Sequence, residues 1–133
     1  MGEHPGAVRA RAVLAAYAEG DLKGVVEQFT PDVVFHVPGR HHLAGDYRGR
    51  DALLGYLETV RGLTGGNLTM ELERVLAGDR YTALFSRLRG TLGTRSVDVL
   101  MAQTFHHGED GLFAEYYALA DDQQAYDAFW GPA

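Results

Sequence analysis

The apolar residues of this chain change their spacing after Gly66, and this change constrains the fold more than any other feature. Before it, apolar residues recur at helical spacing, which predicts helices over residues 7–19, 21–29 and 51–60. After it, apolar and polar residues alternate, which is typical of strands with one buried face. Helices followed by antiparallel strands predict an α+β fold in which three helices pack on one face of a curved antiparallel sheet.

The strands follow from the alternation and from the turn residues between them. They are predicted over residues 33–37, 68–73, 81–90, 95–107 and 112–119. Thr30-Pro31-Asp32 is expected to separate the second helix from the first strand, and Asp121 to cap a final helical turn carrying Phe129 and Trp130. Large apolar residues occur on both faces of 95–107, so we expect the second face to be covered by another copy of the chain, in a homodimer.

Length and composition narrow the class of protein. The chain has 133 residues, which suits a single domain spanning 1–133. A formal net charge of −6 argues against nucleic acid as a partner, because phosphate binding needs a surplus of Lys and Arg. Cysteine is absent, so disulfides and thiolate chemistry are excluded. No apolar run approaches the roughly 18 residues of a membrane span, and the first residues lack the apolar core of a secretory signal, so we expect a cytoplasmic protein.

Several sequence motifs resemble one known family. They are Gly20-Asp21 after the first helix, His36-Val-Pro-Gly39, Leu43-Ala-Gly-Asp-Tyr-Arg-Gly-Arg-Asp51, Asp110-Gly111, and the segment from Asp122-Gln123 to Asp127-Ala-Phe-Trp130. Across nearly the whole chain they are similar to the SnoaL-like branch of the superfamily of nuclear transport factor 2 (NTF2) and ketosteroid isomerase. The resemblance implies a cone-shaped fold enclosing a hydrophobic pocket for a small apolar ligand. It leaves the chemistry open, because this superfamily contains isomerases, cyclases, hydrolases and non-catalytic binding proteins.

The residue set of ketosteroid isomerase is incomplete in this chain. Aligned on the motifs, the position of its carboxylate base falls on Val37, its tyrosine on Val13 and its protonated acid on Gln103. Valine cannot transfer a proton, so steroid isomerisation is not expected. The Asp-Arg-Asp set of related epoxide hydrolases is not apparent either, because Arg95 and Asp98 are three residues apart on a strand and point to opposite faces.

The candidate catalytic residues are the polar groups expected in the cone or at its mouth, namely His36, His42, Tyr17 and Gln103. A histidine with a pKa near 6.5 can carry a proton at neutral pH, and tyrosine or glutamine can polarise a carbonyl. The candidate substrate-binding residues are His41, Tyr47, Met101 and Tyr116, and the segment 36–47 is expected at the pocket mouth. Each has a structural alternative: a strand or loop histidine bonded to backbone, or a core ring with a satisfied hydroxyl.

Neither a metal nor a cofactor is expected. The adjacent pairs His41-His42 and His106-His107 place neighbouring side chains on opposite faces if extended, and HxH, HExxH and glycine-rich phosphate motifs are missing. Two function classes remain. One is a SnoaL-like enzyme (cyclase, isomerase, dehydratase or hydrolase) that acts on a polyketide-like carbonyl compound by cofactor-free acid/base catalysis. The alternative is a non-catalytic protein that binds a small apolar ligand or a protein partner. The missing carboxylate base favours binding, whereas the histidine-rich segment 36–47 favours an enzyme, and of the two classes we predict the enzyme.

Overall fold

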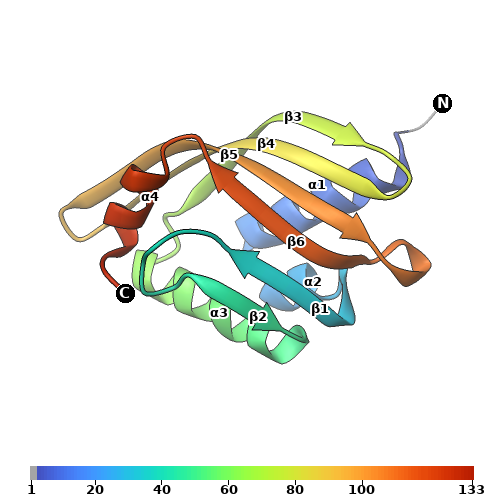
Figure 1. Ribbon diagram of the computed structural model, residues 1–133, viewed down its shortest axis with the longest axis horizontal. Coiled ribbons are helices and arrows are strands. Elements are labelled where there is room, and N and C mark those ends of the chain that lie inside the picture. The colour runs from blue at the N-terminus through green and yellow to red at the C-terminus, as the bar shows by residue number, and fades with distance from the viewer. Residues whose placement is uncertain (1–2) are drawn as a thin grey trace.

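The computed structural model describes residues 3–133, which form helices packed against one curved sheet (Figure 1). The helices are α1 (Pro5–Glu19), α2 (Leu22–Val26), α3 (Arg50–Thr64) and α4 (Gln123–Trp130). The strands are β1 (Phe29–Val37), β2 (Gly45–Arg48), β3 (Thr69–Ala77), β4 (Tyr81–Leu92), β5 (Arg95–His107) and β6 (Phe113–Ala120). The predicted α+β architecture is confirmed, with α4 a full helix in addition to the three that were expected.

The sheet has the strand order β2-β1-β6-β5-β4-β3. All neighbouring strands are antiparallel except β1 and β6, which run parallel, so the expectation of a wholly antiparallel sheet is wrong at this one pair. The physical reason is that no hairpin links these two strands. Their relative direction is set by how the intervening chain folds, and local alternation carries no information about it.

The first strand begins earlier than its sequence suggests. Thr30, Pro31 and Asp32 lie inside β1, although they were expected to interrupt the chain, and Phe29 belongs to β1 and not to the preceding helix. The pairing register of β1 with β6 shifts between Phe29 and Val34. Proline has no N–H to donate to a neighbouring strand. Strands therefore tolerate proline at irregular positions, such as this register shift.

Two further local differences concern short elements. The segment expected to be an irregular loop contains β2, a four-residue edge strand antiparallel to β1 with Val37 opposite Gly45. Its residues are mostly exposed, so it has no apolar alternation by which to be recognised. The cap of α4 is Asp122, whose side chain accepts from the Ala125 N–H, whereas Asp121 accepts from the backbone N–H of Leu100.

The concave side of the sheet holds the core. On β5 the predicted face is the buried one, with Val97, Val99, Met101, Gln103 and Phe105 all less than a tenth exposed. The helices α1 and α3 pack over this side, and α4 packs against β4, β5 and β6 (Figure 1). No helix within residues 3–133 is both long and apolar enough to cross a membrane.

Candidate functional site: an apolar cavity between the helices and the sheet

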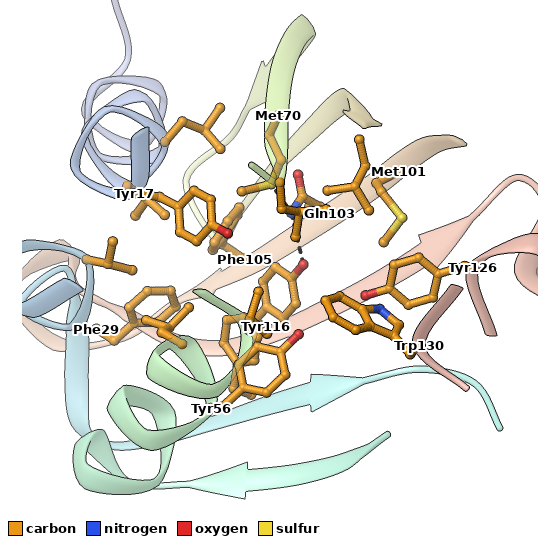
Figure 2. A pocket seen from close by; sticks show the side chains of 18 residues that line it. Tyr17, Phe29, Tyr56, Met70, Met101, Gln103, Phe105, Tyr116, Tyr126 and Trp130 are labelled. Atoms are coloured by element: carbon orange, nitrogen blue, oxygen red, sulfur yellow. Dashed lines mark hydrogen bonds between the residues drawn. The ribbon is translucent and has the colours of Figure 1, made fainter. Parts of the chain in front are cut away.

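A cavity lies between α1, α3 and α4 on one side and the concave face of the sheet on the other (Figure 2). Its free volume is about 80 Å³, so it is a small cavity in this conformation. Its lining is almost entirely aliphatic, aromatic or thioether: Val13, Leu14, Tyr17, Val25, Phe29, Phe35, Tyr56, Leu57, Val60, Leu68, Met70, Leu88, Met101, Gln103, Phe105, Tyr116, Tyr126 and Trp130. This set contains no acidic, basic or imidazole side chain.

Gln103 is the only amide in this lining, and its orientation is held by neighbours on both adjacent strands. The Ser86 hydroxyl on β4 donates to Gln103 Oε1 at 2.6 Å, and Gln103 Nε2 donates to the Tyr116 hydroxyl on β6 at 3.0 Å. The second amide hydrogen faces Met70 Sδ, a weak acceptor, at 3.7 Å. Because Tyr116 accepts from Gln103, its own hydroxyl hydrogen stays available to donate.

Tyr116 is held rigidly at the centre of this arrangement. Its ring stacks on Phe35 with a centroid separation of 3.9 Å and meets Phe105 edge to face. Burial raises the pKa of its phenol well above the ordinary value, which the hydrogen bond from Gln103 only partly offsets. A protonated phenol on a fixed ring is a hydrogen-bond donor at neutral pH, and it cannot serve as a base there.

Two buried polar groups in the lining have no hydrogen-bond partner among the described residues. They are the Tyr17 hydroxyl on α1 and the Trp130 indole N–H on α4. Both residues are at most 5% exposed, so each donor is withdrawn from bulk water. Buried donors in folded proteins are nearly always paired, and a ligand or a cavity water would pair these.

Tyr56 and Tyr126 are the remaining polar residues of the cavity lining. Burial raises the pKa of both phenols, that of Tyr56 most strongly. The Trp130 N–H is close enough to the Tyr126 hydroxyl to lower its pKa somewhat, although it lies outside hydrogen-bonding geometry. The cavity thus presents four neutral phenols, one amide and one indole N–H to whatever occupies it (Figure 2).

The structure places half of the predicted site residues in the cavity. Tyr17, Gln103, Met101 and Tyr116 all line it, which confirms the parity assigned to residues 95–107. The other half, all from residues 36–47, do not line it. Within this segment, residues 41 and 42 lie against the end of the chain, where the His42 N–H donates to the Gly131 carbonyl and His41 forms a bridge with Pro132.

His36 lies on the opposite face of the sheet from the cavity. Its Nδ1 is 2.6 Å from Asp46 and its Nε2 is 2.7 Å from Glu115, and its ring stacks on Tyr117. Burial by itself would lower the pKa of His36, but the two carboxylates outweigh it and raise the pKa. The reason is strand parity: Val37 points inward, so its neighbour His36 points outward.

The other three predicted site residues, His41, His42 and Tyr47, also lie outside the cavity lining. His41 is buried, with Nε2 donating to the Pro38 carbonyl and Nδ1 accepting from the Leu43 N–H, and burial lowers its pKa. Its ring packs edge to face on Tyr126, so it supports a lining residue from behind. The Tyr47 hydroxyl donates to the Leu43 carbonyl. The His42 side chain is exposed.

Sequence reasoning did not identify Tyr56, Tyr126 or Trp130 as lining residues. Their spacing marks them as residues of a buried helix face, but not as residues of the cavity lining. Tyr56 lies three residues after Leu53 and four before Val60, on the buried side of α3, and Trp130 lies four residues after Tyr126 on α4. Among residues 3–133, no group of three His, Asp or Glu side chains is arranged to hold a metal ion.

The fold and the cavity together define a cone-shaped α+β protein of the NTF2-like class. Comparison with known proteins agrees with this, since residues 10–116 match the SnoaL-like domain. An uncharacterized protein of Mycobacterium tuberculosis, Rv0034, is 35% identical over 123 residues, covering 90% of this chain and 92% of that protein. This chain therefore belongs to the SnoaL-like family.

Solved structures show the same fold. Bal32a, from a soil-derived mobile gene cassette, superposes with a TM-score of 0.89 at 30% identity, covering 94% of this chain and 95% of that one. IdmH, a proposed polyketide cyclase from Streptomyces antibioticus, superposes with a TM-score of 0.72 at 19% identity over 90% of this chain and 94% of that one. At that identity the second likeness concerns the fold alone.

Proposed function

We propose that this protein binds a small, mainly apolar compound that carries a carbonyl or hydroxyl oxygen, with the compound enclosed in the cavity. The observation that carries this proposal is the pair of unpartnered donors, Tyr17 Oη and Trp130 Nε1, in an otherwise apolar lining. An unpaired buried donor costs about 1–3 kcal/mol, so ligand oxygens that accept from these groups gain affinity and orientation. The apolar lining supplies the remaining affinity through surface removed from water.

A second candidate function is catalysis, because phenol donors in the cavity can stabilise negative charge. Tyr116 and Tyr17 can donate to an oxygen that becomes an enolate, while Gln103 holds Tyr116 in place. One well-placed donor to such an oxygen contributes about 3 kcal/mol to a transition state. This role suits a cofactor-free cyclase or isomerase acting on a carbonyl compound. IdmH, which shares the fold, is a proposed polyketide cyclase.

The cavity has no evident base for that second function. Its phenols stay protonated and no carboxylate or imidazole lines it, so a proton would have to leave to water or to a group of the substrate. The histidine carrier expected from the sequence lacks a geometric basis, because His36 and His42 lie outside the cavity. We therefore rank binding first and enolate stabilisation second.

Calorimetric titration with the ketone 2-tetralone and its hydrocarbon analogue tetralin tests the proposal. We expect the ketone to bind several-fold more tightly, and this preference to shrink in Tyr17→Phe, which loses the donor facing the cavity. Tyr47→Phe is the matched control, since it removes a phenol hydroxyl outside the lining. The fluorescence of Trp130, the only tryptophan, should respond to both compounds. Equal affinity for ketone and hydrocarbon would contradict the proposed role of the donors.

Proton exchange separates the two candidate functions. An enolate stabiliser should speed the exchange of the acidic hydrogens of 2-tetralone into deuterated water, which NMR measures directly. The rate should fall in Tyr116→Phe and stay unchanged in Tyr47→Phe. If the ketone binds but its hydrogens exchange no faster than in buffer, catalysis is refuted and binding is the remaining function.

We also propose that the protein is a homodimer that pairs through the convex face of the sheet. This face carries exposed large side chains on three strands, namely Tyr81 on β4, Leu76 on β3, and Tyr117 and Leu119 on β6. Exposed apolar groups gathered on one face favour association.

A further inference from the structure

A groove adjoins the cavity between α1 and the start of β3. Its lining shares Leu14, Tyr17, Leu68 and Met70 with the cavity and adds Ala18, Arg61, Gly66 and Thr69 on the outer side. Tyr17 and Met70, which belong to both, lie on the same side of the cavity in Figure 2. The cavity and the groove are therefore neighbouring spaces that share four lining residues, and the lining of the groove also includes a charged side chain.

That charge is the guanidinium of Arg61, in the last turn of α3. It makes one long hydrogen bond, from Nη1 to the Tyr17 carbonyl at 3.5 Å, and it is only half-buried. None of the ion pairs formed within residues 3–133 includes it. A guanidinium presents several N–H donors in a planar fork, so a single bond at this distance leaves most of them unused.

A structural role explains part of this placement. Arg61 lies at the carboxyl end of α1, where a cation interacts favourably with the exposed carbonyls, and it also sits in the last turn of its own helix. Those roles require a positive charge but no access to the cavity. Two observations go beyond them: Arg61 lines the groove, and its charge lowers the pKa of Tyr17 against the larger effect of burial, so its field reaches the unpaired hydroxyl.

From this juxtaposition we infer that the ligand is an amphipathic organic anion, whose apolar body fills the cavity and whose carboxylate or similar oxyanion lies in the groove against Arg61. The inference rests on the proposed binding function and adds the charge of the ligand and its orientation. Tyr17 lines both spaces, and its unpartnered hydroxyl can donate to an oxygen of the same ligand. Hydrogen bonds to a charged oxygen are about twice as strong as neutral ones, so this contact discriminates acids from their esters.

A series of naphthyl acids tests the inference by calorimetry at neutral pH. The probes are 2-naphthoate, 2-naphthylacetate and 4-(2-naphthyl)butanoate, each compared with its own methyl ester. We expect at least one acid, of a chain length that reaches the groove, to bind on the order of tenfold more tightly than its ester. The advantage should fall as salt concentration rises.

Four variants test whether Arg61 causes the preference for the acid. Arg61→Gln should abolish the preference for the acid over its ester, and Arg61→Lys should keep part of it. Arg48→Gln, the same charge change beyond the other end of α3, should leave the preference intact. Thr69→Glu keeps Arg61 in place and puts a competing carboxylate into the groove, so it should also abolish the preference, whether or not Arg61→Gln folds.

The outcomes are distinct for the two proposals. Acids that bind no better than their esters, or a preference that survives in both Arg61→Gln and Thr69→Glu, would overturn the inference while the cavity could still bind neutral compounds. Absence of binding by the esters and by 2-tetralone, with Trp130 fluorescence unchanged, would overturn the binding function itself.

Discussion

Removing the hydroxyl of Tyr17 should stabilise the protein and weaken ligand binding, two effects of opposite sign from one substitution. The hydroxyl is buried without a partner among the described residues, and Phe fills nearly the same volume. An unsatisfied buried hydroxyl costs about 1–3 kcal/mol. Since a cavity water offsets part of this, we expect Tyr17→Phe to raise the free energy of unfolding by about 1 kcal/mol. For a domain of this size that is a rise of about 3–4 °C in melting temperature.

Two other variants, which are expected to lose stability, serve as comparisons for Tyr17→Phe. Tyr47→Phe removes a hydroxyl that donates to the Leu43 carbonyl at 2.7 Å, so the same chemical change should lower the free energy of unfolding by about 1 kcal/mol. Gln103→Leu leaves the fully buried Ser86 hydroxyl without its acceptor and removes the donor to Tyr116, so it should lower stability by about 2 kcal/mol or more.

Urea denaturation followed by Trp130 fluorescence measures all three variants, and titration with 2-tetralone measures their affinity. We expect Tyr17→Phe to be more stable than the wild type and to bind the ketone several-fold more weakly. A Tyr17→Phe protein destabilised as much as Tyr47→Phe would refute the reasoning, because it would mean that the Tyr17 hydroxyl is paired in the ligand-free protein. Unchanged ketone affinity would refute the assignment of that hydroxyl to the ligand.

Further predictions concern the convex face of the sheet. The pKa of His36 is raised in the folded protein, so the stability it contributes is fully present below its unfolded pKa of about 6.5 and is lost as pH rises through the higher folded value; urea titrations from pH 5 to about 8 should show this loss in the wild type and not in His36→Ala. His36→Ala should keep the wild-type affinity for 2-tetralone, and weakened binding would contradict its placement outside the cavity. Light scattering should give twice the chain mass of 14.6 kDa, and Leu119→Glu should give the monomer; a monomeric wild type at micromolar concentration would refute the homodimer.

Local sequence patterns predicted most of the elements. The helical spacing of α1 and α3, the alternation over β5, and the glycines after the first and third helices are all reproduced, with Gly20 and Gly65 in the left-handed conformation that ends a helix. These features depend on residues close together in the chain. The parallel pairing of β1 with β6 was missed, because it joins segments about 80 residues apart and no local residue marks it.

The candidate site was half predictable for the same reason. Gln103 and Tyr116 were recognised because strand parity determines which face each side chain occupies. Parity also placed Val37 inward, and hence His36 outward, but a histidine two residues before Pro38-Gly39 was interpreted as part of a pocket rim. Tyr126 and Trp130 were missed as lining residues, because the docking position of α4 cannot be read from its own spacing.

By itself the sequence determined the α+β architecture, the buried face of β5 and membership of a SnoaL-like family, since each depends on periodicity and local motifs. Only the tertiary structure decided that the histidines of 36–47 lie outside the cavity, that Tyr17 and Trp130 keep unpaired donors inside it, and that Arg61 stands beside it. The physical reason is that periodicity specifies which face of an element is buried. Which faces then meet, and which polar atoms are left without partners, depends on packing between elements distant in the chain.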